Sequence, residues 1–343
     1  MDDVARLSPT DRADLFRSVA AKRGLPEAII EKDFWVCWVL KRVFTLQSPP
    51  AGILFKGGTS LSKVYKLIDR FSEDVDLSFD REGLGFGGAA DPMVAPSRKR
   101  QTAAVENLAK ACQLVVSEKL KPQLAEAFEA SLGTSSGWAL ESAEDDPDNA
   151  TLLFRYPNSP VDSAEYIKPV VRLELGARAD HWPAETGTIQ PFAAEDFPEL
   201  FKSASAEVRV LAVTRTFWEK ATLLHKWHHA TKPFPDRQSR HYYDLYLLAR
   251  SSVRADALAQ LSLLNSVAKH KQVFFAQAWA KYELAKPGTL RLVPPTDRLK
   301  ELEQDYRAMR QMIFGTPPDL KALLAELGEL EAEINSIEPP QNS

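Results

Sequence analysis

Cysteine is scarce in this sequence, and long apolar runs are missing. Among 343 residues only Cys37 and Cys112 are cysteines, and each lies inside an apolar helical pattern. This usage argues against a disulfide-rich secreted framework. The segment Met1 to Arg6 carries too much charge for a secretory signal, and no apolar stretch approaches the ~18 residues of a membrane span. We therefore expect a reduced, cytoplasmic protein with no membrane partner.

A strong excess of positive charge is also missing. The formal net charge is −4, which argues against a globally basic nucleic-acid-binding protein. Hydrophobic residues make up 44%, as in an ordinary globular chain with a large core. Local basic patches remain, either as solvated faces or as contacts to a phosphate backbone. They comprise Arg98, Lys99, Arg100, Lys110, Lys119 and Lys121, and further along Lys226, Lys232, Arg237 and Arg240.

The most distinctive segment joins an apolar strand to a glycine-rich turn. Ile53-Leu54-Phe55 predicts a short buried strand, and two glycines and two hydroxyl residues follow it. Glycines let backbone N–H groups approach phosphate oxygens, and hydroxyls add donors at a helix start. We therefore predict a nucleotide-binding turn. Its residues are Lys56, Gly57, Gly58, Thr59, Ser60 and Lys63.

Two aspartates follow on the next predicted strand. Asp74 and Asp76 alternate with apolar residues, so both side chains point to the same side of the strand. Magnesium prefers hard oxygen ligands and takes one or two carboxylates together with phosphate oxygens. The pair therefore predicts a Mg²⁺ site beside the nucleotide, with Mn²⁺ as an alternative ion. An ordinary hairpin with a solvated acidic edge is the competing interpretation.

A third carboxylate should complete this metal site from a neighbouring strand. In residues 170–175, Glu174 shares a strand face with Arg172, while the apolar residues take the other face. Glu174 is therefore the candidate for a catalytic third acid and a metal ligand. The alternative is a salt bridge between Glu174 and Arg172 at a solvated edge.

Five segments carry a resemblance to a known family: Phe55–Tyr65, Arg70–Leu77, Trp218–Leu224 and Arg240–Leu248, with Ile30–Val36 in an N-terminal helix. They resemble the AbiEii-like nucleotidyltransferase toxins, including the MenT group, within the DNA polymerase β nucleotidyltransferase superfamily. The resemblance implies a nucleotidyltransferase that moves a nucleotide from an NTP to an acceptor hydroxyl and releases pyrophosphate. It further implies that the acceptor is the 3′ end of tRNA, that growth is inhibited, and that a cognate antitoxin is a partner.

By the same resemblance, Lys220 and Asp244 belong to the family's third and fourth motifs. Lys220 falls within an apolar helical stripe, so its ammonium should face inward to a cleft and neutralise the triphosphate. Asp244 would orient Lys220 or the nucleotide. A purely structural ion pair between these two residues is the alternative. Together with Asp74, Asp76 and Glu174, they are the predicted catalytic residues.

The expected fold class is α/β and two-lobed. A polymerase β-type sheet with helices should occupy residues 1–210, and a mainly helical domain that completes the active site should occupy residues 211–343. The expected helices cover Pro9 to Lys22, a stretch from Pro26, residues 97–120 and the chain after Thr214. Strands are expected at 151–156 and 167–175, whereas residues 176–210 mix prolines with short apolar pieces.

Other patterns favour other functions less well. Gly83 to Gly88 fits a dinucleotide-binding motif, but Pro92 delays the next helix beyond it. His225 and His229 have the i, i+4 spacing of a zinc pair, yet they lack the glutamate of the usual motif. Two functional alternatives stay open: modification of a protein hydroxyl, and a non-catalytic module that senses nucleotides or binds a partner.

Overall fold

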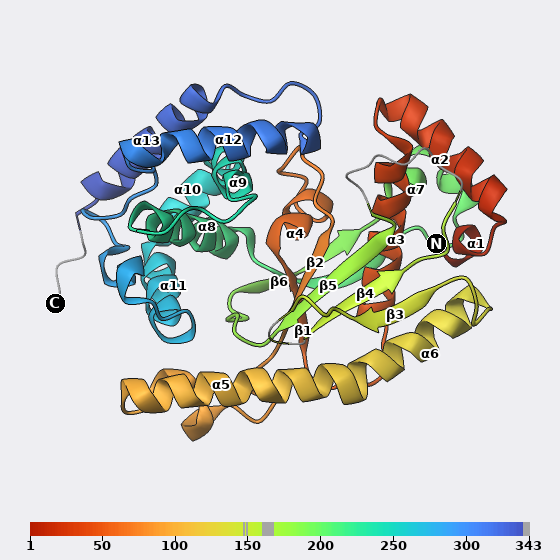
Figure 1. The fold of residues 1–343 in the computed structure, drawn as a ribbon, viewed down its shortest axis with the longest axis horizontal. Helices are drawn as coiled ribbons and strands as arrows, with labels where there is room; N and C mark the ends of the chain where they lie inside the picture. The colour runs from red at the N-terminus through yellow and green to blue at the C-terminus, as the bar shows by residue number, and fades with distance from the viewer. Residues whose placement is uncertain (147, 149, 160–167, 339–343) are drawn as a thin grey trace. The chain divides into compact units, whose positions relative to one another are not determined.

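The computed structural model describes residues 1–146, 148, 150–159 and 168–338 (Figure 1). The chain divides into two compact units. Unit 1 and unit 2 interleave along the sequence, so the expected boundary at residue 210 stays a prediction. Unit 1 comprises Met1–Val64, Ser72–Asp91 and Ala103–Val210, and unit 2 comprises Tyr65–Phe71, Pro92–Thr102 and Leu211–Ser343.

Unit 1 is built on a seven-stranded mixed sheet with the order β3-β4-β5-β2-β1-β7-β6. Strand β2 pairs antiparallel with β1 and parallel with β5, and β1 pairs parallel with β7. Strands β1, β2 and β5, which carry the predicted site residues, are therefore neighbours. The strands are β1 (Ile53–Lys56), β2 (Asp74–Phe79), β3 (Ala139–Ser142), β4 (Thr151–Arg155), β5 (Val170–Gly176), β6 (Ala184–Ile189) and β7 (Ala206–Leu211).

Helix α3 lies in the core of unit 1. It packs on α2, α6, α7 and β5, and the Trp38 ring stacks on Phe154 of β4 with centroids 5.6 Å apart. Its apolar residues cover more than one stripe because it contacts the sheet and other helices at once. The helices starting in this unit are α1 (Asp2–Ala5), α2 (Pro9–Arg23), α3 (Glu27–Phe44), α4 (Gly57–Lys63), α6 (Lys121–Leu132) and α7 (Phe192–Asp196).

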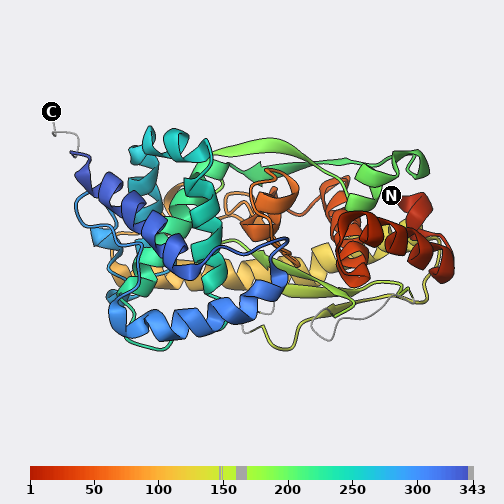
Figure 2. The same ribbon diagram turned by 90° about the horizontal axis from the view of Figure 1, so that it is seen from above.

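Unit 2 is helical (Figure 2). Helix α8 packs on α9, α10 and α11, and α9 packs on α12 and α13. The segment Tyr65–Phe71 joins this unit through main-chain bonds from Phe71 N to Met312 O and from Phe314 N to Asp69 O. The helices are α8 (Val213–His228), α9 (Ser239–Ala249), α10 (Val253–Leu258), α11 (Leu261–Phe274), α12 (Leu299–Met309) and α13 (Leu320–Ser336).

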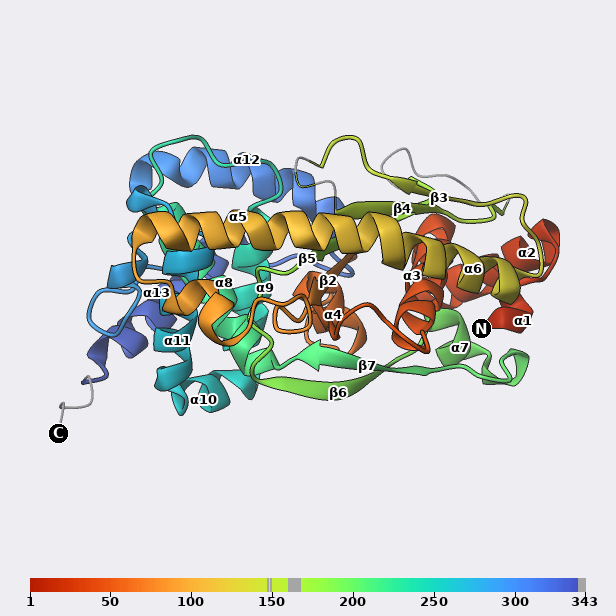
Figure 3. The ribbon, with the colours of Figure 1, turned by 90° about the horizontal axis from the view of Figure 1, so that it is seen from below.

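The α/β class is confirmed, while some element bounds differ from expectation. The helix expected at 97–120 is longer, since α5 (Arg98–Val115) continues through the π-helical turn Val116–Leu120 into α6 (Figure 3). Residues 176–210 contain β6, α7 and β7, which their prolines and short apolar pieces concealed. Residue 167 of one expected strand lies outside the described residues. Within the described part of the chain, no helix has the length and apolarity needed to span a membrane.

Candidate active site

The turn between β1 and α4 depends on Gly57. Its φ of +80° lies in the left-handed region, and β1 and β2 are registered so that Lys56 faces Asp76. A Cβ atom on residue 57 would lie 2.0 Å from Oδ2 of Asp76. Any other residue would therefore strain the backbone and collide with the carboxylate. The turn and the aspartate strand are fitted to each other at this point.

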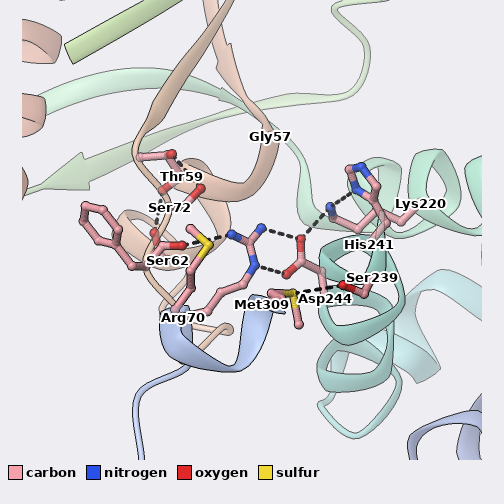
Figure 4. Close-up of polar contacts among 12 residues, drawn as sticks. Gly57, Thr59, Ser62, Arg70, Ser72, Lys220, Ser239, His241, Asp244 and Met309 are labelled. Carbon is pink, nitrogen blue, oxygen red and sulfur yellow. Dashed lines mark hydrogen bonds and ion pairs between the residues drawn. The ribbon is translucent and has the colours of Figure 1, made fainter. Parts of the chain in front are cut away.

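The hydroxyls of Thr59 and Ser60 are used within the chain. Both residues are fully buried. The Thr59 hydroxyl donates to the main-chain oxygen of Asp74. The same hydroxyl oxygen, Thr59 Oγ1, lies 3.0 Å from Ser72 Oγ (Figure 4). The Ser60 hydroxyl donates to the Gly57 carbonyl over 2.8 Å. The Thr59 hydroxyl therefore holds α4 to the start of β2, and the Ser60 hydroxyl bonds within α4. The phosphate contacts expected of these two residues stay a prediction.

Asp74 and Asp76 lie on the partly exposed face of β2, and Val75 and Leu77 are buried on the other face. The parallel register with β5 pairs Asp76 with Glu174. Residues paired across neighbouring strands point to the same face of a sheet. The register therefore brings a third carboxylate next to the aspartate pair.

Glu174 is also engaged with a cation. Arg172 Nε lies 3.1 Å from Glu174 Oε1, and the same guanidinium reaches Asp145 at 3.0 Å. Partial burial and then the charges of Asp76 and Asp74 raise the pKa of Glu174, against the lowering effect of Arg172. The salt bridge left open as an alternative is thus present. It coexists with close approach to the two aspartates.

The donor set fits a metal ion only in part. Between residues 1 and 338, leaving aside 147, 149 and 160–167, no three His, Cys, Asp or Glu side chains are grouped to hold a metal ion. Asp74 and Asp76 are hard oxygen donors of the kind that magnesium combines with phosphate oxygens. The pair therefore fits an ion that arrives with a nucleotide. The three-carboxylate set expected from the sequence is not preassembled, because Glu174 is engaged with Arg172.

The two predicted phosphate-binding lysines occupy different surroundings. Lys56 Nζ lies 3.6 Å from Asp76 Oδ1, beside the aspartate pair. Lys63 is buried, forms an ion pair with Asp33 of α3 and lies 4.0 Å from the ring centroid of Phe192. The surroundings of Lys63 do not support the expected phosphate contact. Its charge is compensated inside unit 1.

In unit 2, Asp244 is the centre of a buried ion network (Figure 4). Arg70 binds both oxygens of its carboxylate, at 2.7 and 2.9 Å, and Lys220 Nζ lies 2.7 Å from Oδ2. Burial alone would raise the pKa of Asp244, but the charges of Arg70 and Lys220 outweigh it and hold the pKa well below its usual range. The Lys220 to Asp244 pair weighed from the sequence therefore exists.

His241 continues this network. Its Nδ1 lies 3.4 Å from Lys220 Nζ. Burial, and then the positive charges of Lys220 and Arg240, lower the pKa of His241 well below its usual value. A neutral imidazole that accepts a hydrogen bond from the ammonium is consistent with this shift. Asp244 and His241 thus fix the position of Lys220 from two sides.

Sequence reasoning missed the role of Arg70. The residue begins the matching segment Arg70–Leu77, but it lies in a stretch with no helical or strand periodicity, so no function was assigned to it. An arginine four residues before the first aspartate of a motif is a weak signal. Its pairing with Asp244, far along the chain, is visible only in three dimensions.

The competing motifs have structural explanations. His225 is buried, with Nε2 2.9 Å from the Lys281 carbonyl and Nδ1 accepting from Arg291 N. Burial lowers the pKa of His225 to about 4. The Gly83–Gly88 segment forms turns after β2 and is followed by a short 3₁₀ segment (Gly88–Ala90). Neither arrangement points to zinc or a dinucleotide.

A mixed sheet whose glycine turn adjoins a strand with two aspartates defines the class as a nucleotidyltransferase. The chain belongs to the family described as "Nucleotidyl transferase AbiEii toxin, Type IV TA system", whose model matches residues 38–326. The resemblance drawn from the motifs is therefore confirmed. Type IV toxin–antitoxin systems are the setting that this family description gives.

Two solved structures are similar to the chain at low sequence identity. The nucleotidyltransferase toxin MenT4 from Mycobacterium tuberculosis H37Rv is 17% identical, with 95% of this chain and 90% of that chain covered and a TM-score of 0.46. An H. pylori protein assigned as a nucleotidyltransferase is 15% identical, with 89% and 93% covered and a TM-score of 0.42. No curated protein matches the chain. The family assignment rests on the family match alone.

Proposed function

We propose that this protein transfers a nucleotide from an NTP to a hydroxyl at the 3′ end of tRNA, releases pyrophosphate and thereby inhibits growth. The fit of Gly57 against Asp76 carries the proposal, because it joins the phosphate-binding turn to the aspartate pair in a chain of this toxin family. The choice of tRNA follows from the motif resemblance.

In this proposal the backbone N–H groups of Gly57 and Gly58 contact the nucleotide phosphates, and Lys56 adds a positive charge beside them. Asp74 and Asp76 hold Mg²⁺, for which Mn²⁺ can substitute. When bound, the ion stabilises negative charge on the phosphate oxygens. Glu174, released from Arg172, accepts the proton of the attacking hydroxyl; its raised pKa suits a group that takes up a proton.

Lys220 is proposed to offset negative charge on the departing pyrophosphate. Asp244 and Arg70 act through it: the carboxylate fixes the ammonium, and the guanidinium fixes the carboxylate. Lys220 belongs to unit 2, so its assignment to the same reaction depends on its place in the family's third motif. The expectation that it shares a crevice with the aspartates stays a prediction.

A labelling experiment tests the acceptor. The purified protein is incubated with Mg²⁺ and each of four NTPs labelled at the α-phosphorus, together with either total tRNA or total soluble protein. We expect label in tRNA, and sequencing of RNA 3′ ends after brief expression should show added nucleotides. Label on protein would contradict the RNA acceptor. Tight NTP binding without pyrophosphate release would indicate a non-catalytic nucleotide-sensing module.

The family description also motivates a partner. We propose that a cognate antitoxin, encoded alongside, relieves the growth arrest, and that both act in the cytoplasm, where tRNA and NTPs are found. Expression of the toxin alone should stop growth. Expression together with the adjacent open reading frame should restore it, and continued arrest would contradict the assignment of that partner.

A further inference from the structure

Helix α3 carries three adjacent charged residues inside an apolar surrounding. Glu31, Lys32 and Asp33 have relative exposures of 2%, 2% and 5%. Charged side chains are rarely buried to this degree unless each is paired and hydrogen-bonded. Each of the three does have a partner far away in sequence. Lys32 pairs with the residue before β2, and Asp33 pairs with the last residue of α4, so both reach elements that carry the candidate site.

Asp33 holds helix α4 at its end. One oxygen forms an ion pair with Lys63, in the last turn of α4. The other oxygen accepts from the backbone N–H of Phe192 over 2.7 Å. Helix α4 begins at Gly57, so a displacement of its last turn would move the phosphate-binding turn as well.

Lys32 holds strand β2 at its start. Its ammonium lies 2.5 Å from Glu73 Oε2 and also donates to the main-chain oxygen of Lys168 over 3.2 Å. Glu73 immediately precedes Asp74. The ion pair therefore fixes the backbone from which both aspartates extend.

Glu31 serves a different place. It accepts from the backbone N–H of Ser159 over 3.0 Å, on the loop after β4. It lies on the same helix as its two neighbours, is as buried and is charged, but it has no contact with α4 or β2 among the bonds of the described residues. Glu31 is therefore a natural control for the other two.

We propose that Lys32 and Asp33 are positioning residues that hold the aspartate strand and the phosphate-binding turn in register with one another. Neither residue contacts the reacting atoms. The hydrogen bond from the Thr59 hydroxyl to the Asp74 carbonyl links helix α4 directly to strand β2. Helix α3 contacts the same two segments through the ion pairs of Asp33 and Lys32. The assignment rests on the proposed function, because the reaction is what requires that register.

The test compares Lys32→Met, Asp33→Asn and the control Glu31→Gln. Asp33→Asn leaves Lys63 buried without a carboxylate and can lose the fold. Lys32→Met removes the ammonium beside Glu73, but Glu73 is partly exposed, so water can solvate its carboxylate and the variant should fold. This variant therefore tests the proposal even if Asp33→Asn does not fold. Two kinds of measurement are made on each folded variant: amide hydrogen exchange in peptides covering 57–63 and 74–79, and the kinetics of nucleotide transfer, which give KM and kcat.

We expect Lys32→Met to accelerate exchange in 74–79 by about tenfold and to lower kcat/KM by ~10- to 100-fold, since small misplacements of catalytic groups have large kinetic effects. Glu31→Gln should change neither, even if its melting temperature falls as far. Equal exchange and equal kcat/KM in Lys32→Met and Glu31→Gln would overturn the proposal. If the wild-type protein transfers no nucleotide, the proposed function fails, while the exchange data still decide whether α3 holds the turn and the strand.

Discussion

The carboxylate of Asp76 fills the space where residue 57 would otherwise carry a Cβ atom, at a distance of 2.0 Å from Oδ2. Gly57 also has a φ of +80°, so two independent requirements select glycine at one position. The backbone of the turn and the side chain of the strand can adopt their positions only together. Their relationship makes the candidate site sensitive to a single methyl group.

Gly57→Ala should remove activity as well as stability. The left-handed backbone alone costs about 1–3 kcal/mol for a residue with a Cβ atom, and the methyl group must also displace Asp76. The matched control is Gly85→Ala, because Gly85 has a φ of +88° but open space around a Cβ atom. We expect urea unfolding to show a lower free energy of unfolding in both variants. Nucleotide transfer should disappear only in Gly57→Ala. Equal activity in the two would contradict the fit.

Asp76→Asn should abolish transfer of a labelled nucleotide while the fold stays intact. The amide keeps the size of the side chain but loses the negative charge that attracts a divalent ion. Circular dichroism and the melting temperature check the fold, and Asp14→Asn, at an exposed position of α2, controls for the loss of an acid. Full activity in Asp76→Asn would refute the metal assignment.

The catalytic and the structural interpretation of Glu174 predict different effects on kcat in two variants. If its carboxylate takes part in the reaction, Glu174→Gln should lower kcat by ~100-fold or more. Arg172→Gln breaks the same salt bridge without altering the carboxylate, and the loss of a partly exposed pair costs at most about 1 kcal/mol. Arg172→Gln should therefore keep kcat within a few-fold of wild type. Parallel losses in both variants would make Glu174 a structural residue.

Local patterns were enough to predict the turn and its neighbouring strands. The apolar run before Gly57 corresponds to strand β1, and the alternation around Asp74 and Asp76 corresponds to strand β2. Each strand is therefore predictable from residues that are neighbours in sequence. Strand β7 was missed because its six residues follow a stretch with prolines and short apolar pieces and end just before helix α8, although Val208 and Val210 are buried and Val210 pairs with β1. A short strand of this kind is stabilised by its pairing partner more than by its own sequence.

Side-chain roles were harder to predict than strand faces. The hydroxyls of Thr59 and Ser60 are common in phosphate-binding turns, but here they bond to main-chain oxygens. Lys63 is of a residue type that commonly contacts phosphate, yet it forms an ion pair with Asp33, thirty residues earlier in the chain. Such pairings join segments far apart in the chain, and residue type alone does not specify them.

Asp244→Asn should strongly destabilise the protein. It leaves Arg70 and Lys220 buried without a carboxylate, and breaking one side of a buried ion pair costs about 3–5 kcal/mol. Glu303→Gln is the control, since it breaks an exposed pair with Arg307 and should change the free energy of unfolding by under ~1 kcal/mol. Urea unfolding at neutral pH measures both. Equal small changes would mean that the buried network does not stabilise unit 2.

His225 should make the protein less stable as the pH falls from about 6.5 to about 4. In the unfolded chain a histidine takes up a proton near pH 6.5, whereas burial lowers the pKa of folded His225 to about 4. Between these values the unfolded state binds more protons, so the free energy of unfolding decreases with acidification. The loss from this group is on the order of 3 kcal/mol and is complete only below about pH 4. Urea unfolding at pH 7.5, 6, 5 and 4 measures the effect, and the free energy of unfolding should depend less steeply on pH for His225→Gln than for wild type. The variant should also be less stable at pH 7.5, because the Arg291 N–H and the Lys281 carbonyl lose their hydrogen-bond partner. Parallel curves for the two proteins would show that His225 titrates alike in the folded and unfolded states.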